Sequence, residues 1–129
     1  ACVGEEMTVL ITGDMSFSYD VNGLSSTYLS PRFKIIVMCN GGGGIFRFIK
    51  PTSDLPELET CFEIHRDISV EKYADLFGLR YFELNDEKSA AEVLSLFFAE
   101  KDRPAILAVH TPNVYNAEVL RGYFRRSRQ

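Results

Sequence analysis

Two polar side chains that could bind a cation follow apolar segments in the first third of the chain. Asp14 comes directly after residues 8–13 and Asn40 after residues 34–39, so the two lie 26 positions apart. Both apolar segments predict buried strands, and in open α/β sheets ligands bind beyond the carboxyl ends of such strands. Carboxylate and amide oxygens suit a hard divalent cation that shares its ligands with a phosphate. The pair therefore predicts a metal site for a phosphorylated ligand.

A run of four glycines, residues 41–44, follows Asn40. Glycines cost chain entropy, so a run after a predicted strand indicates that some group must approach the backbone closely. Exposed amides at the start of a helix favour an anion, and a phosphate is the expected guest. Each residue also has a simpler interpretation, because Asp14 could cap the next helix and Asn-Gly is a common turn.

The bulk properties indicate one globular domain. The chain has 129 residues, of which 46% are hydrophobic and 25% charged, with a formal net charge of −4. No apolar stretch approaches the roughly 20 residues of a membrane helix, so no membrane span is expected. Nucleic acid is not an expected partner, because the only basic cluster is a tail interpreted as a solvated helix end: Arg121, Arg125, Arg126 and Arg128.

Cysteine usage favours a reducing compartment. The three cysteines, Cys2, Cys39 and Cys61, are odd in number and form no close metal-ligand pair. Free thiols in the cytoplasm are therefore expected rather than a disulfide framework. The chain begins at Ala1 without an initiating Met, which predicts a piece of a longer protein.

Strand and helix patterns alternate along the chain. Strands are predicted at residues 7–13, 33–39, 79–84 and 104–110, with burial on both faces. Helices are predicted within residues 17–29, at 69–77 and at about 86–100. A last helix is predicted to begin between residues 112 and 116 and to carry Val119, Leu120 and Tyr123 on its inward face. This order predicts an α/β fold, a three-layer αβα sandwich with a mainly parallel sheet of unknown strand order. Residues 47–66 break the rhythm and are expected to form an excursion over the active edge.

The segment around Asp14 resembles the cofactor signature of thiamine-diphosphate enzymes. That signature opens with Gly-Asp-Gly, here Gly13-Asp14-Met15, and closes near paired asparagines, here Cys39-Asn40. The resemblance implies that Asp14, Asn40 and the main-chain oxygen of Gly42 hold Mg²⁺, with Mn²⁺ as an alternative, beneath the diphosphate. Met15 and Cys39 depart from the signature, but neither replaces an expected metal ligand.

A longer match is more specific. Residues 13–24, 40–48 and 62–65 resemble the 2-succinyl-5-enolpyruvyl-6-hydroxy-3-cyclohexene-1-carboxylate synthase family, a menaquinone-pathway branch of the thiamine-diphosphate enzymes. The likeness covers essentially the whole chain. It implies that residues 1–129 are the carboxyl-terminal part of the diphosphate- and Mg²⁺-binding domain. The amino-terminal portion of that domain, and the amino-terminal and central domains of the enzyme, would lie outside this chain.

The resemblance also implies the site residues. Ile45, Phe46 and Ile49 would form an apolar wall beside the substrate, although they could equally be core residues of a helix start. No catalytic residue is expected in this chain, and neither His65 nor His110 is given such a role. The expected cofactor-binding residues are Gly13, Asp14, Met15, Ser16, Asn40, Gly42, Gly43, Gly44, Ile45 and Phe46.

By resemblance, the parent enzyme decarboxylates 2-oxoglutarate and adds the resulting succinyl unit to isochorismate. It is expected to be a homodimer or a dimer of dimers, and the isolated chain is expected to be inactive. Three alternatives remain open: another thiamine-diphosphate enzyme of the acetolactate synthase or 2-oxoacid decarboxylase type, a non-catalytic phosphate-binding α/β module, and a scaffold domain whose glycines only form a turn.

Overall fold

The structure is a computed structural model that describes residues 6–63 and 68–126. Residues Cys2, His65, Arg66 and Arg128, which figure in the sequence predictions, lie outside the described residues. The chain divides into two compact units. We call residues 6–39 and 68–110 the sheet unit, and residues 40–63 and 111–126 the helical unit.

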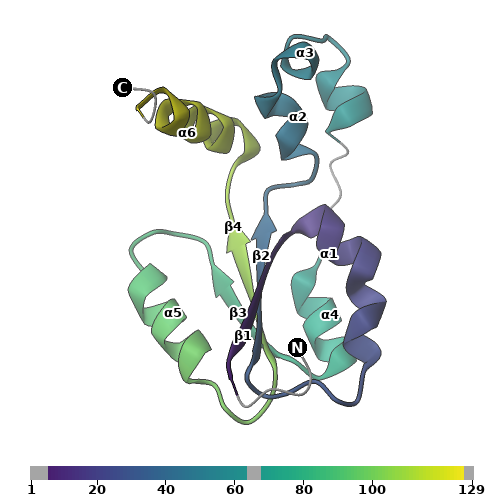
Figure 1. Cartoon of the computed structure of the whole chain (residues 1–129), viewed down its shortest axis with the longest axis vertical. Coiled ribbons are helices and arrows are strands. Elements are labelled where there is room, and N and C mark those ends of the chain that lie inside the picture. Colours follow the sequence, from purple (N-terminus) through teal and green to yellow (C-terminus); the bar gives the residue numbers. More distant parts are fainter. Residues whose placement is uncertain (1–5, 64–67, 127–129) are drawn as a thin grey trace. The chain divides into compact units, whose positions relative to one another are not determined.

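The sheet unit contains four parallel strands in the order β1-β2-β4-β3 (Figure 1). The strands are β1 (Thr8–Gly13), β2 (Phe33–Cys39), β3 (Arg80–Leu84) and β4 (Ala105–His110). All four lie within the segments predicted as strands, and the α/β class with a parallel sheet is confirmed. The strand order was beyond the reach of the sequence patterns.

Burial differs between central and edge strands. Most of β2 and β4 is buried, whereas β1 forms an edge and exposes Val9, Leu10 and Ile11. The prediction of burial on both faces is therefore correct for the central strands and wrong for β1 and for the other edge strand, β3, which exposes Arg80 and Glu83. The reason is topological, because β1 pairs only with β2 among the described strands.

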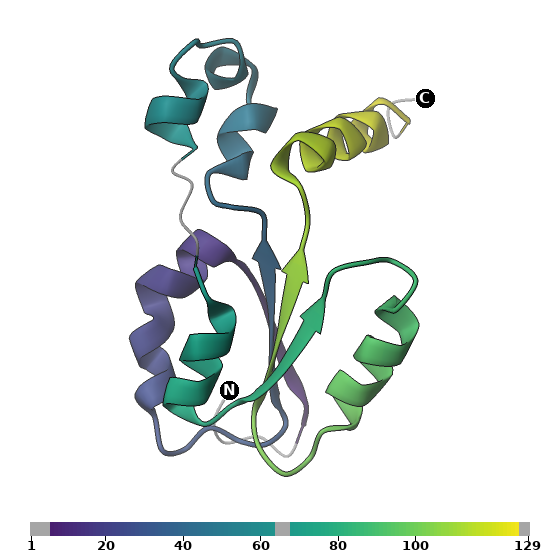
Figure 2. The same ribbon diagram turned by 180° about the vertical axis from the view of Figure 1, so that it is seen from behind.

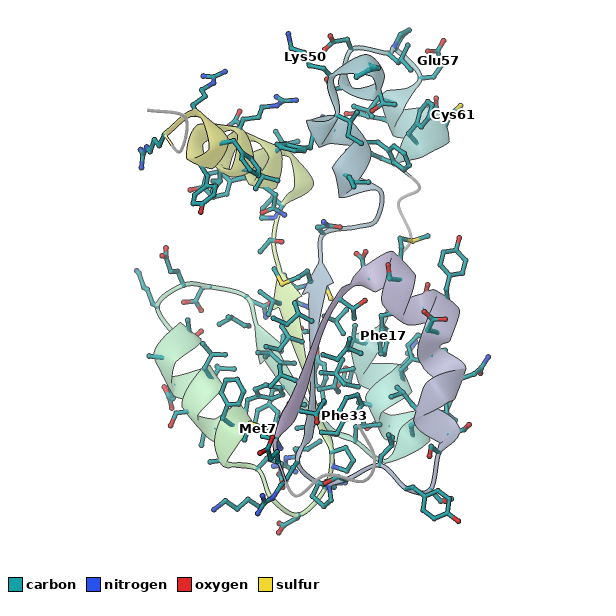
Figure 3. The ribbon with its side chains drawn as sticks, viewed as in Figure 1. Met7, Phe17, Phe33, Lys50, Glu57 and Cys61 are labelled. Carbon is teal, nitrogen blue, oxygen red and sulfur yellow. The ribbon has the colours of Figure 1, made fainter. Side chains whose placement is uncertain are left out.

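Helices cover both faces of the sheet (Figure 2). On one face lie α1 (Asp14–Asp20), the 3₁₀ helix η1 (Val21–Ser25) and α4 (Val70–Phe77), and on the other lies α5 (Ala90–Ala99). Phe17 of α1 and Phe33 of β2 belong to the core cluster on the first of these faces (Figure 3). Phe97 of α5 is fully buried against the opposite face with Ala105 and Leu107. The predicted three-layer αβα arrangement is thus present.

Local signals explain the ends of these helices. The Ser69 hydroxyl accepts the Lys72 amide at 3.4 Å, and Gly78 ends α4 with a φ of 71°, as predicted. The helix predicted from about residue 86 begins only at Ala90, because the Asp86 carboxylate accepts the amides of Lys88 and Ser89 in a preceding turn.

The helix predicted within residues 17–29 starts earlier and ends earlier. It begins at Asp14, immediately after β1, and tightens to a 3₁₀ helix at Val21 that ends at Ser25. A glycine, Gly23, lies in this last turn, where it weakens helical propensity.

The helical unit contains α2 (Gly44–Phe48), α3 (Lys50–Ser53), the π-helical turn η2 (Leu58–Phe62) and α6 (Asn113–Arg126). The described part of the predicted excursion, residues 47–63, is therefore largely helical rather than an open loop. Pro51 lies in the first turn of α3, where its missing N–H is tolerated. Lys50, Glu57 and Cys61 are exposed on this segment (Figure 3).

The inward face of α6 is not the one predicted. The helix starts at Asn113, inside the predicted window, but Val119, Leu120 and Tyr123 are exposed. Ala117 is buried, and the Phe124 ring lies 5.8 Å from that of Phe48 in α2. Arg121 and Phe124 lie three positions apart on one side of α6 and contact α2, although Phe124 itself is 46% exposed.

Candidate functional site

Asp14 is the first residue of α1 and directly follows the last residue of β1. Its side chain is buried, with 5% of the residue exposed, and its Oδ1 accepts the Met15 amide at 2.8 Å. Gly13 occupies the N-cap position, so Asp14 does not cap the helix in the usual sense. The carboxylate therefore lies in the first turn of the helix, bonded to the backbone of the next residue.

The register of the sheet brings the first two strand ends to one edge. Gly13 lies opposite Met38 in the parallel pair of β1 and β2, and Cys39 lies opposite His110 in the pair of β2 and β4. Asp14 and Asn40 therefore each follow a strand that ends at the carboxyl edge of the same sheet. This is the edge at which α/β sheets bind their ligands.

The glycine run forms a turn that other residues could not adopt easily. Gly41, Gly42 and Gly43 have φ angles of 85°, 84° and 66°, in the left-handed region that disfavours side chains. The Gly42 amide donates to the Asn40 Oδ1 at 3.2 Å, which fixes the orientation of the amide side chain. Gly44 then begins α2.

A close approach exists at Gly43, but its partner is protein backbone. A Cβ placed there would lie 2.6 Å from the Phe62 carbonyl oxygen and 2.7 Å from the Glu63 Cα. The glycine run by itself predicts the close approach of a phosphate. At this glycine the packing of the end of η2 is sufficient reason for the missing side chain.

The other predicted site residues divide between the two units. Met15 and Ser16 follow Asp14 in α1 of the sheet unit, and Ser16 is exposed. Ile45, Phe46 and Ile49 lie in or just after α2 of the helical unit. Ile45 is 63% exposed and Ile49 is exposed, so neither is a core residue among the described residues; the Phe46 ring instead packs 5.4 Å from the Phe62 ring.

Sequence patterns missed an ion-pair cluster in the helical unit. Arg47 Nε and Nη2 donate to the two carboxylate oxygens of Glu63 at 2.8 and 2.5 Å, and Nη2 also reaches Glu59 at 2.9 Å. Hydrogen bonds that Arg47 donates to Glu63 first, and then to Glu59, raise the pKa of Arg47 above its ordinary value. No spacing rule predicts this cluster, because its members are 12 and 16 residues apart and belong to different elements.

Arg121 also takes part in the helical unit. Its Nη2 donates to the Arg47 carbonyl oxygen at 2.6 Å, which ties α6 to α2. The prediction that the arginine tail is a solvated helix end is therefore wrong for Arg121. Arg125 and Arg126 are exposed, as predicted.

Cys39 occupies the position where the cofactor signature carries its first asparagine. Its thiol lies 3.6 Å from the Val37 carbonyl oxygen. Burial, assisted by the carboxylates of Asp14 and Glu83, raises the pKa of Cys39 to about 11. The thiol is therefore neutral at physiological pH, and like Cys61 it is free of any disulfide.

A three-residue cluster that the sequence patterns do not predict lies on β3 and β4. The His110 Nε2 is 3.2 Å from the Glu83 carboxylate, and the Tyr81 hydroxyl donates to the same carboxylate at 3.1 Å. Burial and the charge of Glu83 raise the pKa of Tyr81. These three side chains are partly exposed on neighbouring strands.

Two features are absent from the described residues. Within residues 6–63 and 68–126, no group of three or more His, Cys, Asp or Glu side chains is arranged to hold a metal ion. In the same part of the chain, no helix is long and apolar enough to cross a membrane.

Comparison with known proteins identifies the family. No model of a protein family matches the chain. It is, however, 49% identical over 117 residues to the 2-succinyl-5-enolpyruvyl-6-hydroxy-3-cyclohexene-1-carboxylate synthase of Porphyromonas gingivalis. The chain belongs to this synthase family. The family resemblance inferred from the motifs around Asp14 and Asn40 is thereby confirmed.

Two further synthases of the family extend the match. Those of Flavobacterium johnsoniae and Christiangramia forsetii are 40% and 37% identical, over 97% and 93% of this chain. The match to the Porphyromonas gingivalis synthase covers 91% of the chain. The chain spans only about a fifth of the length of these synthases: 20% for Porphyromonas gingivalis, 23% for Flavobacterium johnsoniae and 21% for Christiangramia forsetii.

Proposed function

We propose that this chain anchors the diphosphate of thiamine diphosphate, through Mg²⁺ or Mn²⁺, in a 2-succinyl-5-enolpyruvyl-6-hydroxy-3-cyclohexene-1-carboxylate synthase. The anchoring role is supported above all by the parallel register of β1 and β2. Because of this register, Asp14 and Asn40 follow strands that end at the same edge of the sheet. The reaction is supported by the names of the three related synthases, which are 37 to 49% identical to the chain.

The proposed donor set fits a hard cation. Asp14 supplies a buried carboxylate, Asn40 an amide oxygen, and Gly42 a main-chain oxygen. Mg²⁺ takes oxygen ligands and usually completes its shell with water and substrate phosphates, so an all-carboxylate cluster is not required. Two local bonds support preorganisation, because the Met15 amide orients Asp14 and the Gly42 amide orients Asn40.

Thiamine diphosphate, when bound, supplies the electron sink for decarboxylation of a 2-oxoacid. The chain's own residues bind and orient. Asp14, Asn40 and Gly42 would fix the cation, and Gly13, Met15, Ser16, Gly43 and Gly44 would border the diphosphate. Ile45, Phe46 and Ile49 would exclude water beside the substrates, a role that the exposure of Ile45 and Ile49 supports.

The same proposal covers partners and location. The substrates would be 2-oxoglutarate and isochorismate, and the other domains of a dimeric enzyme or a dimer of dimers would complete the site. The chain would be the carboxyl-terminal part of the diphosphate-binding domain, and alone it would be catalytically silent. The thiols Cys39 and Cys61 support a cytoplasmic location.

Cofactor titration of the intact synthase tests the proposal. Asp14→Ala should weaken Mg²⁺-dependent binding of thiamine diphosphate by more than about 100-fold, because even residues that only orient metal ligands cost about 10- to 100-fold. Asp75→Ala, the same change at an exposed position in α4, should leave the affinity unchanged. Equal affinity in Asp14→Ala and the wild type would refute the anchoring role.

Substrate choice separates the remaining alternatives. The intact enzyme should consume 2-oxoglutarate only with isochorismate as acceptor. Turnover of pyruvate to acetolactate, or simple release of an aldehyde, would instead indicate another thiamine-diphosphate enzyme. Magnesium-dependent binding of the cofactor without any turnover of the complete protein would favour a non-catalytic module.

A further inference from the structure

Arg47 and Glu63 form a two-pronged ion pair inside the helical unit. Arg47 belongs to α2, and Glu63 follows the end of η2. The side chain of Glu63 is 0% exposed, and Arg47 contacts both of its carboxylate oxygens. A buried carboxylate is costly unless it is paired and hydrogen-bonded, and a bidentate guanidinium fixes direction as well as distance. The pair therefore holds the backbone at Glu63 in one place relative to α2.

The backbone at Glu63 packs against the glycine turn. The Cα of Glu63 and the carbonyl oxygen of Phe62 lie 2.7 and 2.6 Å from where a Cβ of Gly43 would be. Gly43 is followed at once by α2, which carries Arg47 three residues beyond Gly44. The glycine turn therefore lies between the end of η2 and α2, and Arg47 of α2 is bonded to Glu63 at that end.

A third element, α6, also contacts α2. Arg121 of α6 donates to the Arg47 carbonyl oxygen at 2.6 Å, and the Phe46 ring packs against Phe62 at 5.4 Å. With these contacts α2 is bonded to both η2 and α6. The glycines themselves supply no side-chain contacts, so neighbouring elements contribute to the shape of the turn beside the bond between the Gly42 amide and Asn40 Oδ1.

We infer that Arg47 and Glu63 are positioning residues that hold the Gly41–Gly44 turn in its diphosphate-binding shape. The inference rests on the proposed function and adds residues that touch neither the metal nor the cofactor. Glu59 provides the internal comparison, because it bonds to the same Arg47 guanidinium but is 69% exposed. An exposed carboxylate contributes little to such a pair, since water and salt screen it.

The test compares Glu63→Gln with Glu59→Gln in the intact synthase. Each change replaces one carboxylate of the same cluster by an amide of nearly equal size. We expect Glu63→Gln to raise the apparent dissociation constant of thiamine diphosphate with Mg²⁺ by at least about tenfold, with kcat at saturating cofactor within about threefold of the wild type. Glu59→Gln should change the dissociation constant by less than about twofold.

Hydrogen exchange locates the effect. In the cofactor-free enzyme, Glu63→Gln should speed exchange in peptides that cover Asn40–Phe46 and leave those of β2 and β4 unchanged. Saturating cofactor should restore the slower exchange. Arg47→Lys keeps the charge but loses the bidentate geometry, so it should show the same split between affinity and kcat and decides the matter where Glu63→Gln does not fold.

The outcomes distinguish this inference from the function on which it rests. An unchanged dissociation constant and unchanged exchange in both Glu63→Gln and Arg47→Lys would overturn the positioning role, even if Asp14→Ala abolished binding. A lower yield of folded enzyme with normal affinity in the folded fraction would also overturn it, because the pair would then be only structural. Cofactor binding that survives Asp14→Ala would instead refute the anchoring site.

Discussion

The carbonyl oxygen of Phe62 lies 2.6 Å from the point where Gly43 would carry a Cβ. The two residues are 19 positions apart, yet the backbone of one leaves no room for a side chain on the other. Gly43 also has a φ of 66°, which L-residues with a side chain adopt at a cost. Steric and torsional requirements thus coincide at a single glycine of the run.

Replacing this glycine should destabilise the helical unit. Gly43→Ala places a methyl group against the Phe62 carbonyl and forces the left-handed conformation on alanine, which alone costs about 1 to 2 kcal/mol. We expect a loss of at least about 2 kcal/mol of unfolding free energy, measured by urea denaturation of the protein. Gly23→Ala is the matched control, because a Cβ there meets nothing within 4 Å. Equal stability of the two variants would contradict the packing argument.

We expect the buried side chain of Lys34 to make the free energy of unfolding depend on pH in the alkaline range. Its ammonium is fully buried and donates to the carbonyl oxygens of Glu100 at 2.7 Å and Pro31 at 3.1 Å. Burial lowers the pKa of Lys34 below its usual 10.5, and the Glu100 charge opposes the shift only in part. Between the native pKa and 10.5 the unfolded chain holds this proton and the folded chain does not, so this group adds stability as pH rises.

Lys34→Met should remove that contribution. Unfolding free energies measured from pH 8 to about 10.5 should rise more steeply with pH, or fall less, in the wild type than in Lys34→Met. Lys88→Met, at an exposed position, should follow the wild type. Parallel curves for the wild type and Lys34→Met would show that the proton on Lys34 is not linked to folding.

Cys39 and Cys61 should differ in reactivity. Because the pKa of Cys39 is raised to about 11, only about one part in a thousand of this thiol is thiolate at pH 8, and the side chain is also half-buried. Cys61 is exposed in η2. Iodoacetamide at pH 8, followed by peptide mass spectrometry, should label Cys61 at least about tenfold faster than Cys39. Similar rates would mean that Cys39 is more open than its burial indicates.

Phe97 should be the costliest aromatic residue to remove from the α5 face of the sheet. It is fully buried, with ring centroids 5.7 Å from Phe82 and 4.9 Å from Phe98. Phe97→Ala removes this contact area and leaves a cavity, so we expect a loss of about 3 to 5 kcal/mol of unfolding free energy. Leu96→Ala, at the exposed neighbour, should cost less than about 1 kcal/mol. A comparable loss for both would place the core elsewhere.

The elements of the sheet unit could be predicted because their signals are local. The strands were visible as apolar runs, Ser69 and Gly78 marked the ends of α4, and Asp14 and Asn40 were recognisable as polar residues after strands. The family could be recognised for the same reason, since its motif lies within two short segments. Such patterns depend on residues close together in the chain.

The errors arose where partners come from distant segments. Its large apolar residues predict that Val119, Leu120 and Tyr123 form the inward face of α6, but the helix contacts α2 through Arg121 and Phe124. Likewise, β1 was expected to be buried on both faces and instead forms the edge of the described sheet. Neither result follows from hydrophobic periodicity, because periodicity does not identify the neighbour that covers a surface.

The α/β class, the four strands of the described sheet, the two polar residues that follow β1 and β2, and the family could all be inferred from the order of the amino acids. Three features become visible only in the folded chain: the strand order β1-β2-β4-β3, the close contact between Gly43 and Phe62, and the ion pair of Arg47 with buried Glu63. The physical reason is the range of the interactions. Propensity, capping and alternation act over a few residues, whereas exclusion of a side chain and pairing of a buried charge depend on segments that only folding brings together.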